Sequence, residues 1–260
     1  MIMKRFFIAL ILCTSLMSGM TDCSSDEQDY SFYIKVGSGV SCSELAHVVA
    51  VYPPWAQAVQ GYDSKLGNCA IAAFAVGCEF LHIVDVELSI ANRSTFEYRQ
   101  FQTPTTGGAS YTREFDLSVT PILFTVNLLG RGIPHLNMDV ADGKIYPMVG
   151  AAIGMSNLLI TNFRTTGLPS TGGSAPYESF SAENQYTLRK NFTYTIQAGL
   201  EYSHTDRWAI GTGYRWFNAG DFTGPEYQRT GTGAAVDLAD EQWQMRFRAQ
   251  EWFLEFKIFI

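Results

Sequence analysis

The stretch NFTYTIQAGLEY, residues 191–202, decides the fold, because its apolar and polar residues alternate strictly. Every second residue from Phe192 to Tyr202 is apolar or aromatic. The positions between them are Thr193, Thr195, Gln197, Gly199 and Glu201. A period of two is that of a β-strand, whose successive side chains point to opposite faces. The stretch therefore predicts a strand with one apolar face and one polar or small-residue face.

The same alternation recurs along the whole chain and predicts eight strands of about ten residues or more. The predicted strands are residues 30–36, 69–80, 84–98, 113–129, 144–155, 191–202, 208–217 and 243–260. Two of them contain an irregularity. Pro121 interrupts the fourth strand and is expected to mark a bulge, since proline cannot donate to the ladder. The last strand is expected to shift its phase near Gln250.

Two architectures use strands of this kind. A soluble sandwich or lipocalin turns the apolar face inward, whereas a membrane barrel turns it to lipid and encloses the polar face. The even strand number and the glycine and alanine on the polar face favour the barrel. The fold class is thus predicted to be all-β, an eight-stranded antiparallel transmembrane up-and-down β-barrel. Its lumen is predicted to hold a network of charged side chains: Lys35, Glu79, Glu87, Arg93, Glu201, Arg215, Glu255 and Lys257.

The connections between the strands alternate in length. Four are long and rich in Gly, Ser, Thr and Pro: residues 37–68, 100–112, 156–190 and 218–242. Residues 81–83 and 203–207 are tight turns, and 130–143 is intermediate. Outer-membrane barrels have short periplasmic turns and long extracellular loops, so the tight turns and both termini are predicted on the periplasmic side.

The first residues have the layout of a secretory signal peptide. Lys4 and Arg5 precede an apolar run from Phe6 to Cys13, followed by small residues. That run is too short for a spanning helix, which needs about 20 residues. Residues 1–19 are therefore predicted to be a signal peptide, and 20–260 the outer-membrane barrel domain with four long extracellular loops.

Composition excludes nucleic-acid binding and fits a membrane barrel. The 260-residue chain has a formal net charge of −7, and phosphate neutralisation requires clustered Lys and Arg. Aromatic residues make up 14% and charged residues only 17%. The longest apolar stretch after the first 19 residues, Cys69 to Gly77, is too short to span as a helix. A membrane protein without spanning helices must be a closed barrel, because lipid cannot satisfy open backbone groups.

The sequence resembles the opacity-type and OmpA-like transmembrane barrels. The resemblance is carried by IYPMVGAAIGMS (145–156), FTYTIQAGLEY (192–202), RWAIGTGYRWF (207–217) and WFLEFKIFI (252–260). That superfamily includes many surface antigens of Gram-negative bacteria. The resemblance implies outer-membrane lipid and lipopolysaccharide as surroundings, the barrel assembly machinery during insertion, and a host or cell-surface ligand for the loops. This chain ends Phe259–Ile260 instead of in the aromatic residue usual for the family.

Four cysteines follow the signal peptide: Cys23, Cys42, Cys69 and Cys78. A disulfide between Cys42 and Cys69 would staple the first long loop near the barrel rim, and an oxidising compartment permits it. Free thiols are the alternative, and four cysteines allow three connectivities. No CxxC or paired-histidine spacing predicts a metal site, and no cofactor is expected.

No grouping of residues predicts catalysis. Ser203 and His204 are adjacent at a predicted turn, but no third orienting group accompanies them. The segment NMDVADG, residues 137–143, fails the calcium-loop pattern and is interpreted as a polar turn. Residues 43–59 are unusually apolar for a loop, and a self-packed loop, a short helix over the barrel mouth or a contact surface would each explain them.

Three functions follow from these patterns. The leading hypothesis is a non-enzymatic surface protein with a structural, antigen or adhesin-like role, carried by the resemblance and the long loops. A narrow porin-like channel is the alternative, although charges of both signs in an eight-stranded lumen favour a plugged interior. A lipid A-modifying enzyme is the third hypothesis.

Overall fold

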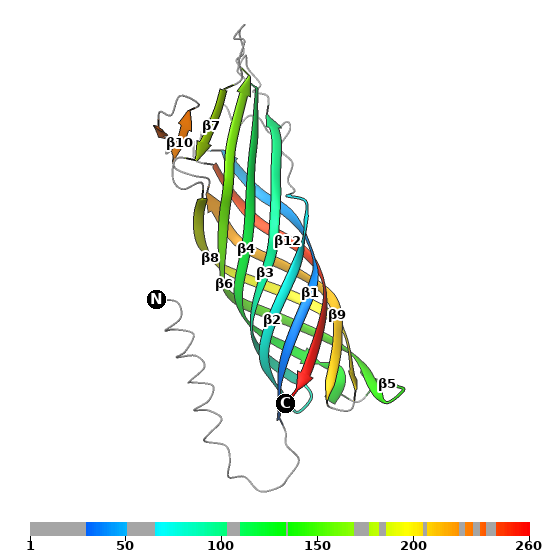
Figure 1. Ribbon diagram of the computed structural model, residues 1–260. Coiled ribbons are helices and arrows are strands. Elements are labelled where there is room, and N and C mark those ends of the chain that lie inside the picture. Colours follow the sequence, from blue (N-terminus) through cyan, green and yellow to red (C-terminus); the bar gives the residue numbers. More distant parts are fainter. Residues whose placement is uncertain are drawn as a thin grey trace, which may run out of the picture.

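The computed structural model describes residues 30–50, 66–102, 110–133, 135–168, 177–181, 186–204, 207–223, 227–230, 235–237 and 243–260. In these ranges the chain forms a closed antiparallel β-barrel (Figure 1). The predicted signal peptide, residues 1–19, lies outside the described residues. Within the described ranges, no helix is long and apolar enough to cross a membrane.

Eight long strands form the barrel wall. They are β1 (Tyr30–Ala50), β2 (Asn68–Phe80), β3 (Val84–Gln102), β4 (Ser110–Leu129), β6 (Gly143–Leu168), β8 (Tyr186–His204), β9 (Trp208–Thr223) and β12 (Trp243–Phe259). Each pairs antiparallel with the next in this order, and β12 pairs with β1 to close the ring. The fold class predicted from the alternation is confirmed. A closed ring leaves no unpaired edge, which is the condition for a sheet to span lipid.

Five short elements are added at the two ends of the barrel. A single 3₁₀ turn, η1 (Gly130–Gly132), and strand β5 (Met138–Val140) lie between β4 and β6, at the end where the tight turns and the C-terminus lie (Figure 1). Three strands lie at the opposite end: β7 (Tyr177–Ser181), β10 (Tyr227–Thr230) and β11 (Ala235–Asp237). The segment 137–143, interpreted above as a polar turn, therefore contains a strand that forms a hairpin with β6.

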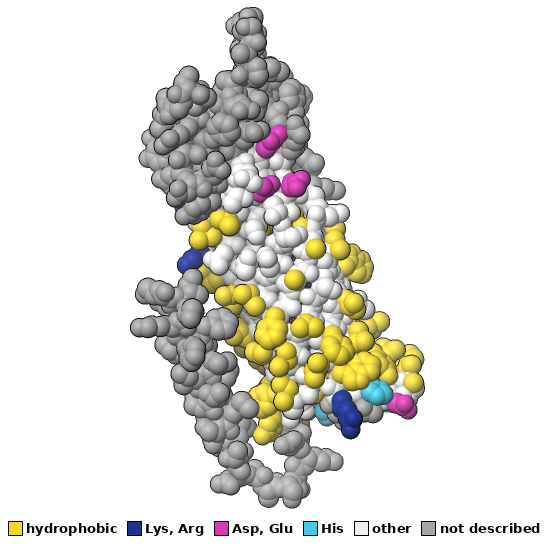
Figure 2. Space-filling view, in the orientation of Figure 1, with side chains coloured by type: hydrophobic (Ala, Val, Ile, Leu, Met, Phe, Trp, Pro, Cys, Tyr) yellow, Lys and Arg dark blue, Asp and Glu magenta, His cyan; other side chains and the backbone are white. Residues whose placement is uncertain are grey.

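The lower part of the barrel, toward the tight turns, is apolar outside and polar inside. Figure 2 shows many hydrophobic side chains over the visible face of this part. Phe74, Ile153 and Leu200 face outward, and Ile153 has 56% of its surface exposed. On the inner face, Glu87 and Lys257 are buried. This distribution is inverted relative to a soluble protein and matches a lipid-facing wall.

The upper part of the barrel has the opposite polarity. Phe96, Phe115, Leu117 and Phe247 point inward and are buried. On the same strands the outward positions are polar, and Figure 2 shows acidic side chains there. Apolar residues inside and polar residues outside are what a wall in water requires. The barrel therefore extends beyond its lipid-facing belt as a water-exposed β-structure.

Two predictions are wrong because the surroundings of the wall change at this level: the bulge at Pro121 and the phase shift near Gln250. The inward face of β4 runs without interruption from Phe115 through Pro121 to Leu123, and Pro121 pairs regularly with Ser156. Pro121 thus marks no bulge. Likewise β12 keeps one phase through Gln250, with Phe247 and Phe253 both facing inward. What changes at these points is the type of residue found on each face.

The pairing shifts at four other places in the described part of the wall, of which two lie in β3 and β9. In β3, Ser94 and Thr95 both face outward between Arg93 and Phe96, where the pairing with β4 shifts. In β9, the pairing with β12 shifts between Asn218 and Gly220. Each bulge inserts one residue and locally bends its strand. The bulge in β3 brings Phe96 to the inner face.

Several strands are also longer than predicted at their upper ends, so the connections between them are shorter. Residues 37–50 of the first predicted loop continue β1, and 156–168 of the third continue β6. The apolar segment 43–59 is therefore strand up to Ala50, and its remainder lies outside the described residues.

Candidate functional site: the barrel interior

The lowest layer of the lumen is organised around two buried lysines. Lys257 Nζ lies 2.8 Å from an oxygen of Asp85 and 2.9 Å from one of Glu201. Lys35 Nζ lies 2.5 Å from Glu87 and 2.9 Å from Glu255. Each lysine thus bridges two carboxylates that come from different strands. Since all these charges are buried, the loss of one partner would leave an uncompensated charge inside the wall.

Two tyrosine hydroxyls complete this layer. Tyr146 donates to Glu201 at 2.6 Å. Tyr33 donates to Asp85 and also lies 3.2 Å from Glu87. A buried carboxylate needs several donors to offset its lost hydration, and the phenols supply them alongside the lysines.

The middle layer is built by two arginines. Arg215 reaches Glu255 at 3.1 Å and donates to Gln197 at 2.9 Å. Arg93 makes two hydrogen bonds to Glu251, at 2.6 and 2.8 Å, and its guanidinium lies 3.7 Å from the centre of the Phe217 ring. Two parallel bonds between a guanidinium and a carboxylate are the strong, directional form of an ion pair. They lie at the boundary between the polar and the apolar parts of the lumen.

Above this layer the lumen is filled by a hydrophobic cluster. Phe247 packs edge-on against Phe96, with ring centroids 5.1 Å apart, and against Phe217 at 6.1 Å. Leu117 and Leu158 are buried in the same cluster. Side chains from six of the eight strands contribute to it, so the cluster lies inside the bore at this level.

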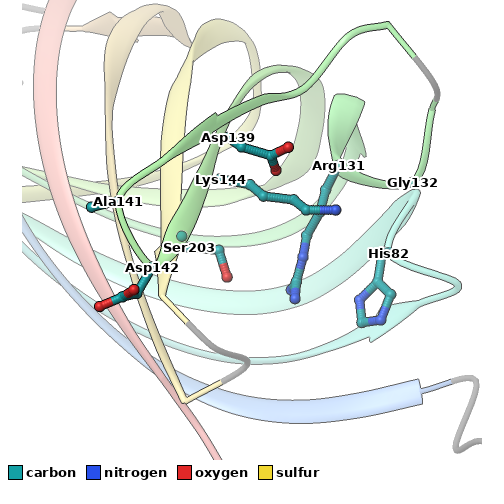
Figure 3. Close-up of a pocket in the computed structure, with 9 residues that line it drawn as sticks. His82, Arg131, Gly132, Asp139, Ala141, Asp142, Lys144 and Ser203 are labelled. Carbon is teal, nitrogen blue, oxygen red and sulfur yellow. The ribbon is translucent and has the colours of Figure 1, made fainter.

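At the end where the tight turns lie, the lumen opens into a vestibule of about 440 Å³ (Figure 3). Lys144, Arg131 and Ser203 line it, together with His82 and residues of the β5–β6 hairpin. Glu79, buried at this rim, accepts from Arg131 at 3.1 Å, and one of its oxygens lies 2.7 Å from a His82 ring nitrogen. The vestibule leads only to the ion-pair layers, because Tyr146 and Glu201 occupy the next level of the lumen.

The structure places all eight predicted charged residues inside the barrel. Seven belong to the connected layers, and Glu79 lies at the rim. Sequence reasoning missed four ionisable members of the network: Tyr33, Asp85, Tyr146 and Glu251. Their inward positions in the alternation were a usable signal for all four. The tyrosines were overlooked because an aromatic residue in a barrel strand is more often lipid-facing or interfacial.

Of the two alternatives for Cys42 and Cys69, the structure has the free thiols and not the disulfide. Ser41 pairs with Cys69, and Cys42 pairs with Asn68. Because paired residues share a face and neighbours alternate, the two sulfur atoms lie on opposite faces of the wall. A disulfide needs its two Cβ atoms to approach one another, so this pair cannot be bridged without moving the backbone.

This interior is suited to stability and closure. Among the described residues, no serine, threonine or cysteine side chain is hydrogen-bonded to a histidine, and no group of three or more His, Cys, Asp or Glu side chains is placed to hold a metal ion. The fold and its interior define a transmembrane β-barrel with a filled lumen.

Comparison with known proteins finds solved outer-membrane barrels that are similar to this chain. No family model matches the chain, and no curated protein matches it at a significant level. The neisserial surface protein A is similar over 89% of this chain and 99% of its own, with 11% identity and a TM-score of 0.44. Ail, the attachment invasion locus protein of Yersinia pestis, solved with the heparin analogue sucrose octasulfate, covers 88% of this chain and 99% of its own, with 11% identity and a TM-score of 0.38. The outer membrane protease OmpT from Escherichia coli covers 92% of this chain and 99% of its own, with 8% identity and a TM-score of 0.40.

Proposed function

We propose that this chain is a non-enzymatic integral protein of the bacterial outer membrane that presents a binding surface to the outside of the cell, as an adhesin or a surface antigen. One observation carries the proposal: the wall continues past its lipid-facing belt as a water-exposed extension with its own hydrophobic core. A barrel that served only as a membrane plug would not need that extension. The hydrophobic core of the extension holds the upper ends of the strands beyond the lipid-facing belt.

The filled lumen supports this proposal over a channel. A solute entering from the periplasm would meet the lysine layer, then the arginine layer, then the apolar cluster. Passing the first two layers would break buried ion pairs, and removing one partner of such a pair costs about 3–5 kcal/mol. Passing the third would open a packed core. These barriers in series favour a closed barrel.

The arrangement of polar groups also supports a non-enzymatic role. A hydrolase needs a nucleophile within hydrogen-bond reach of a base, and the base held by a third group. Among the described residues, His82 is hydrogen-bonded to Glu79, but no nucleophile is hydrogen-bonded to His82. Ser203 faces the lumen, while His204 is stacked on Trp208 with ring centroids 5.0 Å apart. We therefore propose that the chain acts by binding.

The surface role is tested with whole cells. Cells that express the chain in their outer membrane should attach to cultured epithelial cells more than cells with the empty vector. A variant in which residues 51–65 are replaced by a short Gly-Ser linker should keep the barrel and attach less. Folding of both proteins is checked by their faster migration in unboiled gel samples. Equal attachment of all three strains would contradict the adhesin proposal.

The channel alternative is tested separately. Purified protein in a planar bilayer should give no steady conductance steps, with a general porin at the same protein-to-lipid ratio as the control for insertion. Reproducible steps of one size would overturn the closed lumen. Loss of acyl chains from lipid A on expression would overturn the non-enzymatic role.

A further inference from the structure

The periplasmic β5–β6 hairpin exposes an unusual amount of apolar surface. Met138 has 66% of its surface exposed and Val140 is also exposed, as are Ile133 and Leu136 in the segment between η1 and β5. The tight turns of such a barrel normally lie in water, where exposed large apolar side chains of this density are unfavourable. Figure 1 shows β5 projecting from the lower end of the barrel.

The apolar face of this hairpin continues the lipid-facing wall in register. Met138 pairs with Ile145, Ile145 with Tyr202, Tyr202 with Ile210, and Ile210 with Phe256. Paired residues of neighbouring strands share a face. Met138 therefore lies in the same outward row as residues of the belt itself.

The backbone pairing also indicates that the hairpin lies at the depth of the lipid-facing belt. The ladder between β4 and β6 ends at Leu129 and Met148, and β6 continues below that point to Gly143. There β5 pairs with β6 from Gly143 to Ile145. An unpaired strand edge is costly in lipid, where no water satisfies its backbone groups. The hairpin thus covers the edge of β6 where β4 has already ended.

The other face of the hairpin is polar. Asp139 and Lys144 pair across β5 and β6 and line the vestibule (Figure 3). Nearby, Tyr202 and Trp208 lie on the outer face with ring centroids 5.7 Å apart, as in the aromatic girdle that marks a membrane–water interface. The hairpin is therefore amphipathic: one face continues the belt and the other faces the aqueous vestibule.

We propose that the β5–β6 hairpin docks on the periplasmic leaflet of the membrane, with Met138 and Val140 among the acyl chains next to the headgroups. The occupant of this apolar face is lipid, because the face is continuous with the lipid-facing belt and lies at its girdle. The inference rests on the membrane position of the barrel proposed above. It makes the hairpin an interfacial anchor that fixes the depth of the barrel.

Site-directed fluorescence tests the docking in the full chain, reconstituted in phosphatidylcholine vesicles. The native cysteines are replaced by serine, and one cysteine is introduced for an environment-sensitive label: Met138→Cys, Asp139→Cys as the matched control on the opposite face, or Ile153→Cys as the control in the belt. Each protein must show the gel shift of a folded barrel. The quenchers are nitroxide lipids and a water-soluble nickel chelate.

The label at 138 should emit at shorter wavelength than the label at 139, and nitroxide near the headgroup should quench it at least twofold more strongly. The nickel chelate should quench mainly the label at 139. If the label at 153 responds to deep nitroxide but the label at 138 responds only to nickel, the hairpin lies in water and the inference fails. Shielding of 138 from both quenchers would indicate a protein partner or a second copy, and would also overturn it. If 153 is not quenched by lipid nitroxide, the membrane position itself is wrong.

Discussion

Arg93 of β3 and Arg246 of β12 make similar contacts in different surroundings. Arg93 binds Glu251 through two hydrogen bonds in the closed interior. Arg246 binds Asp221 through two hydrogen bonds, at 2.6 and 3.1 Å, on the outer surface of the water-exposed extension. The chemistry of the two pairs is the same, so burial decides how much each contributes to the stability of the barrel.

We predict that Arg93→Ala lowers the free energy of unfolding by about 3–5 kcal/mol, because it leaves the Glu251 carboxylate buried without its main partner. Arg246→Ala, the matched control, should lower the free energy of unfolding far less, since water screens an exposed pair. Urea unfolding in lipid vesicles, followed by the gel shift of the folded barrel, measures both. Equal losses for the two variants would show that burial does not set the strength of these pairs.

The sequence predicted most of the charges that lie inside, although not Asp85 and Glu251, and it did not predict which of them pair. Alternation assigns a face to every residue of a strand, and this was sufficient for Lys35, Glu87 and Lys257. Partners depend on the shear of the barrel, which brings together residues far apart in the chain, such as Arg93 and Glu251. Shear is set by register across all eight strands, and a single strand carries no information about it.

At the scale of one strand, β9 offers a direct test of packing inside the wall. Gly213 pairs with Gly199 of β8, and a Cβ at position 213 would lie 2.7 Å from the Phe253 ring and against the carbonyl oxygen of Ala198. Gly211, two residues away on the same inward face, has space: a Cβ there would come no closer than 3.6 Å to its neighbours.

We predict that Gly213→Ala lowers the free energy of unfolding by about 1–3 kcal/mol, the usual cost of overpacking. Gly211→Ala should be neutral within about 0.5 kcal/mol, because ordinary van der Waals contact is already available. The same unfolding assay compares them. A Gly213→Ala variant as stable as its control would mean that Phe253 moves aside freely, which would contradict a tightly packed interior.

The position of each strand was predictable, whereas the upper end of several was not. The alternation located all eight strands, and β2 and β12 agree with their predicted bounds to within one residue. Other strands continue past the level at which the apolar side chains change from the outer to the inner face. In the sequence this change looks like a shift of phase at Pro121 and at Gln250. Sequence alone cannot separate a shift of phase from a change of solvent, because both reverse which residues fill the expected apolar positions.

At the scale of the molecule, the same barrel wall faces lipid in its lower part and water in its upper part. Along the outer face of β4, Ile122, Phe124 and Val126 face lipid, while Ser118 and Asp116 face water. The inner face changes in the opposite sense, from Asn127 and Thr125 to Leu117 and Phe115. The boundary on both faces falls within a few residues of Pro121. This coincidence is expected if the membrane surface crosses the barrel there, because the wall must then exchange its apolar side.

Lysine substitutions at two positions of β4, Phe124 and Ser118, test where that boundary lies. Lysine at Phe124, whose side chain is 48% exposed in the middle of the belt, should cost about 2–4 kcal/mol relative to Phe124→Ala in vesicles. Lysine at Ser118, on the same strand and the same outward face, should cost less than about 0.5 kcal/mol relative to Ser118→Ala, because the ammonium stays in water. In each case alanine removes the native side chain and isolates the effect of the charge. If both lysines cost the same, the belt does not lie in lipid at Phe124, and the exchange of faces near Pro121 has no membrane surface to explain it.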